Sequence, residues 1–176
     1  ESVAALADGL RAGSGGTTGA LRSNVGRVSI PAEPAVVINE VAWMGTEASA
    51  SDEWIELHNR SGSPVDIGGW SVYGADTGEC LNVSEADGAL TTTIPAHGYL
   101  IYANHKDDLL DVEGVTIVTI WDASIGLNNT SPGQLILYDA AGCVGTAVDT
   151  VNQVSGDWLA GDAGDRRTME RRRPDA

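Results

Sequence analysis

Four carboxylates lie close together on two expected neighbouring strands, early in the chain: Glu40, Asp52, Glu53 and Glu56. Two carboxylates that face each other across neighbouring strands could act as general acid and base, as in glycoside hydrolysis. The alternative is structural, because the same side chains could form ion pairs with arginines of the C-terminal stretch RTMERRR, residues 167–173. The spacing of these residues is compatible with both interpretations.

A second acidic group lies between residues 74 and 89, the longest irregular piece of the expected domain. Asp76, Glu79, Glu85 and Asp87 could supply oxygen ligands for calcium. Their spacing matches neither an EF-hand nor an Asp/Gly nonapeptide repeat, so solvation of an acidic surface explains them better. Long loops in compact domains are often functional. This segment is therefore the best candidate for a recognition loop.

The remaining residues that could do chemistry are few. His58, His97 and His105 match no metalloprotease spacing, and the chain has no Gly-x-Ser-x-Gly motif and no phosphate-binding glycine loop. We therefore predict no catalytic residues and no cofactor. Cys80 and Cys143 have no CxxC pattern or neighbouring histidine. We predict a disulfide between them, as in an exported protein, with two separate thiols in a reducing compartment as the alternative.

The elements that position these residues are predicted to be short strands. In residues 52–59, Ile55 and Leu57 alternate with polar or bulky neighbours, which is the two-residue period of a strand with one wet face. Eight such segments are separated by turn formers. They are residues 36–43, 53–59, 69–74, 90–94, 98–103, 115–121, 134–139 and 147–153. The pattern predicts an all-β sandwich of about eight strands.

Tryptophans are expected to contribute much of the core, since the chain has five Trp and no Phe. Trp54 and Trp70 are predicted to anchor the two facing sheets, and the core is predicted to be centred on Ile55, Leu57 and Trp70. At least four of the five tryptophans are expected in the core. The predicted cost of Trp70→Ala is about 3–5 kcal/mol, the range for deleting a buried large aromatic.

The charge is strongly negative and unevenly distributed. The net charge is −15, and residues 28–165 hold 21 acidic residues against Arg60 and Lys106. Such a surface repels phosphate backbones, so nucleic-acid binding is not expected. The arginine-rich C-terminal stretch is expected to pair with carboxylates of the chain. No run approaches the roughly 20 apolar residues of a membrane span, so direct membrane insertion is not expected either.

Residues 1–34 differ from the rest and are predicted to be a flexible arm or linker. Residues 13–19 are rich in Gly, Ser and Thr, and Val25 to Ile30 alternates weakly before Pro31 and Pro34. The arm has too little apolar surface to fold alone. It is therefore a candidate assembly element, followed by a β-sandwich domain over residues 35–176.

Five motifs, taken in order, resemble the lamin-tail domain family in its bacterial secreted form. They are INEVAWMG (38–45), SDEWIELHN (51–59), VDIGGW (65–70), TIPAHGYL (93–100) and WLAGD with TMER (158–162 and 168–171). The resemblance covers roughly residues 36–171. It implies an immunoglobulin-like β-sandwich without a general catalytic site. Because the family keeps its acidic strand residues together with its MER ending, it also implies that Arg171 is the structural partner of Glu40 and Glu56.

These observations lead to an expected function. We predict a non-catalytic interaction or structural module, extracellular or at the cell surface, whose partners are other proteins, including copies of itself. Self-assembly into a filament through the N-terminal arm is one form of this function. The alternative is an accessory targeting or binding domain of a larger secreted hydrolase or nuclease.

Overall fold

The computed structural model describes residues 33–76, 78, 80–84, 91–104, the backbone of 116–119, and 126–172. All of them lie in the unit Glu33–Ala176. The predicted arm up to Ala32, the calcium candidates Glu79, Glu85 and Asp87, and His105 and Trp121 lie outside the described residues.

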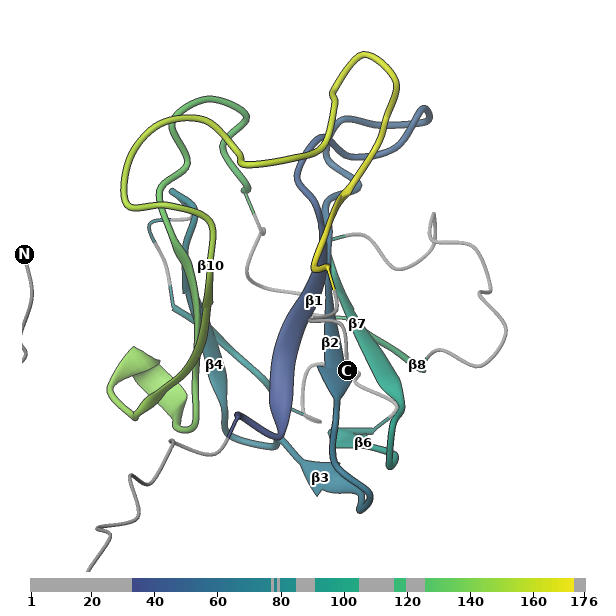
Figure 1. Cartoon of the computed structure of the whole chain (residues 1–176), viewed down its shortest axis with the longest axis vertical. Coiled ribbons are helices and arrows are strands. Elements are labelled where there is room, and N and C mark those ends of the chain that lie inside the picture. The colour runs from purple at the N-terminus through teal and green to yellow at the C-terminus, as the bar shows by residue number, and fades with distance from the viewer. Residues whose placement is uncertain are drawn as a thin grey trace, which may run out of the picture. The chain divides into compact units, whose positions relative to one another are not determined.

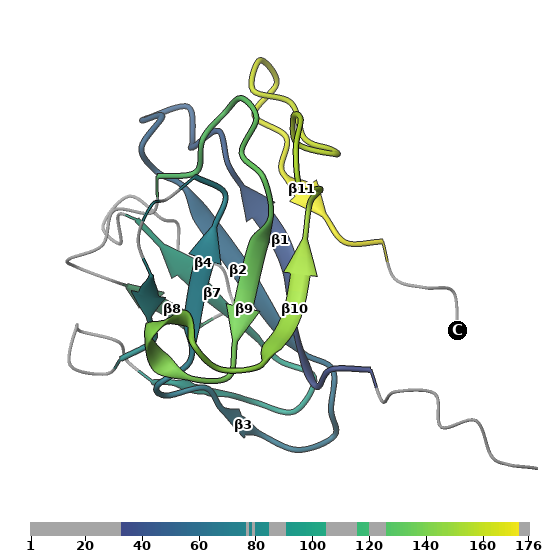
Figure 2. The ribbon, with the colours of Figure 1, turned by 90° about the vertical axis from the view of Figure 1, so that its left-hand side faces the viewer.

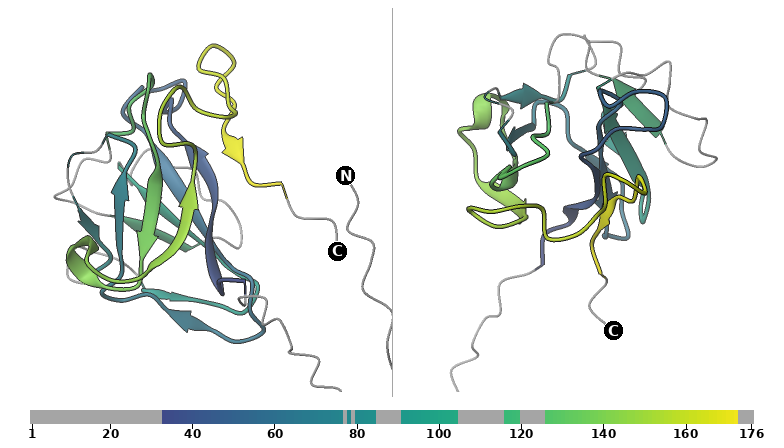
Figure 3. Two further views of the ribbon diagram at one scale, coloured as in Figure 1. Left: turned by 60° about the vertical axis from the view of Figure 1, so that its left-hand side comes forward. Right: turned by 90° about the horizontal axis from the view of Figure 1, so that it is seen from above.

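Two β-sheets face each other, as the views in Figure 1 and from above in Figure 3 show. The larger sheet has the strand order β11-β1-β2-β7-β8, and only its β7–β8 pair is parallel. Its strands are β1 Val36–Ala42, β2 Trp54–Asn59, β7 Tyr99–Ala103, β8 Thr116–Thr119 and β11 Met169–Glu170.

The second sheet is antiparallel throughout, with the order β10-β9-β4-β5. Its strands are β4 Ser71–Gly74, β5 Leu81–Asn82, β9 Leu135–Tyr138 and β10 Ala147–Val151. A small pair, β3 Val65–Asp66 with β6 Thr93–Ile94, and a single 3₁₀ turn, Ala141–Cys143, complete the described elements. The prediction of an all-β sandwich is confirmed.

Each predicted strand overlaps an observed one, whereas three observed strands were not predicted. These are β3, β5 and β11, each two residues long. A two-residue strand has no period to detect in the sequence, and its pairing is decided by elements far away in the chain. β11 matters most here, because it forms one edge of the larger sheet through Met169 and Glu170.

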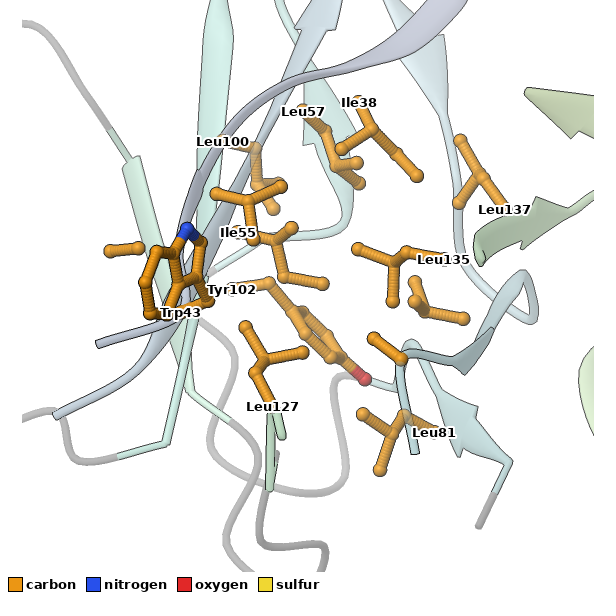
Figure 4. Packing of buried hydrophobic residues seen from close by; sticks show 14 of the residues in the cluster. Ile38, Trp43, Ile55, Leu57, Leu81, Leu100, Tyr102, Leu127, Leu135 and Leu137 are labelled. Atoms are coloured by element: carbon orange, nitrogen blue, oxygen red, sulfur yellow. The ribbon is translucent and has the colours of Figure 1, made fainter. Parts of the chain in front are cut away.

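The core fills the space between the sheets, as the close view in Figure 4 shows. Ile55 and Leu57 are fully buried, while their neighbours on β2 are only half-buried, so the predicted alternation is present. Tyr102 of β7 is also fully buried, and its hydroxyl donates a hydrogen bond to the carbonyl of Asn82 in the opposite sheet, at 2.9 Å. The sheets are therefore joined by packing and by at least one polar contact.

The tryptophans occupy different places from those predicted. Trp70 and Trp54 are only partly buried and pack against the margin of the core, so the core is not centred on Trp70. Trp54 shares the outward face of β2 with Glu56 because side chains alternate along a strand. Trp43 and Trp158 are the buried pair, with 7% and 9% of their surface exposed.

Candidate functional site

The edge strands β10 and β11 of the two sheets lie on the same side of the sandwich (Figure 2). Arg171 directly follows β11 and contacts both β1 and β10 there. Its Nη2 lies 2.5 Å from Oδ2 of Asp149 on β10, and its Nε donates to the carbonyl oxygen of Ile38 on β1, at 3.0 Å. The same Asp149 oxygen accepts the Ile38 N–H, at 2.8 Å. We call this arrangement of Arg171, Asp149 and the Ile38 backbone the Arg171 clasp.

The clasp supplies hydrogen-bond partners for the backbone where β1 is irregular. The register between β1 and β2 shifts between Ile38 and Glu40, which indicates a β-bulge. In the bulge, both backbone groups of Ile38 are bonded to side chains of the clasp. Asp149 has only 9% of its side chain exposed, so its charge would be costly without this pairing.

The predicted ion-pair partner of Arg171 was wrong. Arg171 pairs with Asp149, whereas Glu40 accepts a hydrogen bond from the Thr168 hydroxyl and Glu56 accepts one from the Asn39 amide, at 2.7 Å. The physical reason is the position of β11. Once β11 has paired with β1, the next residue lies at the margin between the sheets, where Asp149 is the buried carboxylate.

Three carboxylates form a row across β11, β1 and β2. Glu40 lies directly opposite Glu170 on one side and Glu56 on the other. Like charges directly opposite each other are destabilising. Burial raises the pKa of Glu56, and the charges of Glu40 and Glu170 raise it further, while the hydrogen bond from Asn39 acts against them.

The geometry of this row favours a structural role over the acid–base site considered from the sequence. The hydrogen-bond partners of Glu40 and Glu56 are a hydroxyl and an amide, which hold the carboxylates in the sheet. Neither residue lines either of the two clefts described below. Asp52 and Glu53 are buried beside the loops at the end of the sandwich, so the four carboxylates do not converge on one space.

An apolar groove of about 510 Å³ lies beside the clasp, between β10 on one sheet and β1 and β11 on the other. We call it the seam groove. Its apolar lining includes Val41, Val151, Met169 and Leu159, and Leu159 has 65% of its surface exposed. Glu170, Arg171 and Arg172 also line it. The volume lies within the usual range of ligand pockets, about 300–1,000 Å³.

A second, cationic cleft of about 290 Å³ adjoins the first. It is lined by Arg60, Arg171 and Arg172 together with His58, whose ring stacks on Tyr99 with a centroid distance of 4.3 Å. The two clefts share Asn39, Arg171 and Arg172 in their linings. The chain enters this region at Glu33, which forms an ion pair with Arg60 at 3.0 Å.

The strand beside the seam groove has an open edge. In the part of the chain that the structure describes, β10 pairs only with β9. The edge of β1 is different, because the clasp binds Ile38 and β11 pairs with Glu40 and Val41. The groove therefore combines an apolar floor with one strand edge that has no strand neighbour, which is the arrangement needed to add an extended segment.

The tryptophan pair has a structural role. Trp43 and Trp158 stack with ring centroids 6.0 Å apart, and both indole N–H groups donate to backbone carbonyls, of Ala160 and Asn128 respectively. They hold the long segment between β10 and β11 against the core. A polar pocket of about 340 Å³ lies next to them, but the rings themselves are almost fully buried.

The predicted disulfide is confirmed, since Cys80 and Cys143 are bonded. It ties the segment before β5 to the 3₁₀ turn after β9. The calcium candidates remain a prediction. Asp76 accepts a hydrogen bond from the Asn128 amide at 2.6 Å, and its three proposed partners lie outside the described residues. Among the residues that the structure describes, no group of three or more His, Cys, Asp or Glu could hold a metal ion.

Glu53 is a titratable group whose environment the sequence did not reveal. Only 7% of its surface is exposed, and its carboxylate accepts the N–H of Leu127 at 2.9 Å. Burial raises the pKa of Glu53 to about 7, and the Leu127 hydrogen bond only partly opposes this. In the alternation of this segment Glu53 falls on the same face as Ile55 and Leu57, but acidic side chains are seldom buried. Its partner Leu127 lies 74 residues later, so the hydrogen bond could not be read from the local sequence.

Comparison with known proteins agrees with this architecture. The family model for the lamin tail domain matches residues 29–155, well over half of the 176-residue chain. No curated protein matches the sequence. The match includes β1 to β10, with the carboxylates of β1 and β2 and both cysteines. The chain therefore belongs to the lamin tail domain family, and the immunoglobulin-like β-sandwich implied by the resemblance is its fold.

Proposed function

We propose that this chain is a non-catalytic interaction module that associates with copies of itself, one copy's N-terminal arm adding a strand to the β-sandwich of the next. The observation that carries the proposal is the open edge of β10. β10 has five residues, against two in each of β5 and β11 and four in β8, the other strands at the sheet edges. A long open edge is a template for pairing with another chain.

The arm has the composition of a donor. Val28 and Ile30 are apolar residues two positions apart, and Val25 precedes them. The arm up to Ala32 carries three arginines and two acidic residues, whereas residues 33–176 carry seven basic and 23 acidic residues. Electrostatic attraction therefore favours arm-to-body contacts over body-to-body contacts. Because head-to-tail contacts close only at special rotations, the assembly is a filament.

The same proposal places the protein outside the cell or on its surface. The Cys80–Cys143 disulfide supports this, because such bonds persist in oxidising compartments. No helix in the described part of the chain is long and apolar enough to cross a membrane. The acidic surface keeps neighbouring filaments apart and soluble.

Light scattering tests the proposal. The described core cluster consists of residues between Val36 and Met169, so deleting residues 1–30 removes no member of this cluster. We expect the full chain to grow in mass with concentration and the shortened chain to remain a folded monomer. A full chain that is monomeric at millimolar concentration would contradict self-association. A shortened chain that polymerises like the full chain would contradict the role of the arm.

A further inference from the structure

We infer that the seam groove is the acceptor site, and that it binds residues 26–30 of a second copy with Val28 and Ile30 inside and Arg27 beside Glu170. This inference rests on the proposed self-association and assigns its site. The groove lies along the side of the molecule where β10 and β11 are neighbours in Figure 2. Its residues belong to both sheets, so a docked segment would close the sandwich at this side.

The length and pattern of the donor fit the groove. In an extended chain, Gly26, Val28 and Ile30 fall on one face, and Arg27 and Ser29 on the other. Five extended residues span about 17 Å, which is the length of the five-residue strand β10. Gly26 has no side chain, so the segment presents two aliphatic side chains to a groove floor that is itself aliphatic.

Strand addition is directed to β10 because the facing strand is already occupied. On β1, the clasp binds both backbone groups of Ile38, and the Asn39 carbonyl accepts the Arg171 N–H at 2.7 Å. A segment in the groove therefore finds hydrogen-bonding partners only on its β10 side. The clasp also ties β10 to β1 beside the groove.

The groove offers one carboxylate to the donor. Glu170 lines the groove, is exposed, and forms no ion pair with any described residue. Arg171 is neutralised by Asp149 at 2.5 Å, but Arg172 also lines the groove and is exposed, so the charges of the lining nearly cancel. In the inferred complex, Arg27 pairs with Glu170, and the pair sets the position of the donor along β10.

The donor is assigned to a second copy because residues that precede proline favour extended conformations, and this applies to both Ile30 and Glu33. An extended arm carries the donor to a neighbour.

The first experiment measures binding of a synthetic peptide of residues 22–32 to the chain that lacks residues 1–30. We expect saturable binding, with Leu159→Asp in the protein or Val28→Asp in the peptide weakening it at least tenfold. The matched control is Val154→Asp, because Val154 is 78% exposed and does not line the groove. A scrambled peptide of equal charge separates groove binding from general attraction to an acidic protein.

The second experiment reverses charges in the full chain. We expect Glu170→Arg and Arg27→Glu each to raise the concentration needed for association at least tenfold, and the double variant to restore it. Glu47→Arg, at an exposed position away from the groove, controls for the change in net charge. Circular dichroism verifies that each variant is folded.

The outcomes separate the two proposals. If the full chain associates through its arm but Leu159→Asp has no effect and the double charge variant shows no rescue, the acceptor site is wrong and self-association stands. If the full chain never associates and the peptide does not bind, both proposals fail. If the peptide binds with equal affinity after Leu159→Asp, the groove is again excluded.

Discussion

The buried carboxylate of Asp149 connects two segments of the chain that are far apart in the sequence. One oxygen of Asp149 accepts hydrogen bonds from a backbone N–H of β1 and from a guanidinium next to β11. The pair is less exposed than an ordinary surface ion pair, with 9% and 32% of the two side chains accessible. Removing one partner therefore leaves a poorly solvated charge, which costs more than the pair itself contributes.

We expect Asp149→Ala to destabilise the fold by about 2–4 kcal/mol, because it leaves the Ile38 N–H and the Arg171 guanidinium without their acceptor. Urea unfolding followed by tryptophan fluorescence measures the change. Asp157→Ala is the control, since Asp157 is exposed and accepts only one backbone hydrogen bond, from Ser131 at 3.3 Å. Equal effects of the two substitutions would show that the clasp has no special role.

Glu53 makes the stability depend on pH. Its pKa is raised to about 7 by burial, so the folded state binds a proton more tightly than the unfolded state. The resulting stabilisation is fully present below pH 4.5 and is lost as the pH rises to about 7. At about 1.4 kcal/mol per pKa unit, the loss is on the order of 3 kcal/mol.

Glu53→Gln isolates this contribution, because the amide oxygen can still accept the Leu127 N–H. The free energy of unfolding of the wild type should fall between pH 4.5 and pH 8. In the variant, this fall should be about 2–3 kcal/mol smaller. The general repulsion within an acidic protein affects both proteins alike. If their pH profiles run parallel, the carboxyl of Glu53 does not titrate in this range.

At the scale of the elements, Gly74 at the end of β4 lies against the backbone of Gln134, just before β9. Its φ is +104°, and an added Cβ would lie 2.0 Å from the carbonyl oxygen of Gln134. We expect Gly74→Ala to cost at least about 3 kcal/mol, since backbone strain and a clash with the main chain add together. Gly69→Ala is the control, because Gly69 also has a positive φ, of +78°, but has open space around it.

Thermal unfolding compares the two glycine variants. If Gly74→Ala is no more destabilised than Gly69→Ala, the two strands can separate at this point without loss, and the described pairing of β4 with β9 is wrong there.

The disulfide stabilises the second sheet by joining segments that are 63 residues apart. On the chain-entropy model, closing a loop of this length contributes about 4 kcal/mol. We expect the double variant Cys80→Ser, Cys143→Ser to lose roughly this amount in chemical denaturation. An unchanged midpoint would mean that the loop is restrained equally well without the bond.

Local patterns in the sequence were sufficient to predict the long strands, but they did not show which strands lie at the edges of the sheets. The alternation around Ile55 and Leu57 predicts β2, since burial on one face of a strand leaves a period of two. β11 has two residues, and its place beside β1 depends on contacts across more than 120 positions. The partner of Arg171 was missed for the same reason, because the margin between two sheets is visible only after both have formed.

The candidate site was foreseen only in part. The arm remains a prediction from glycine-rich composition. The open edge of β10 could not be predicted, because it depends on which strand each sheet ends with. Trp70 was expected at the centre and lies at the margin, since tryptophan is amphipathic and packs as well at a boundary as in a core.

At the scale of the whole molecule, charge separates the arm from the body. The body carries 16 more acidic than basic residues, and the arm up to Ala32 one more basic than acidic residue. We expect association to weaken when sodium chloride is raised from 0.05 to about 0.5 M, because screening reduces attraction between arm and body. Stronger association at high salt would show that repulsion between bodies outweighs the attraction.

Hydrogen exchange at β10 tests the central claim most directly. The account predicts that amides of Ala147–Val151 exchange slowly in the associated full chain and quickly in the chain lacking residues 1–30, because an added strand covers this edge. Leu81–Asn82, at the opposite edge of the same sheet, should exchange equally in both. Equal exchange at β10 in both proteins, under conditions where the full chain is associated, would contradict strand addition at this edge.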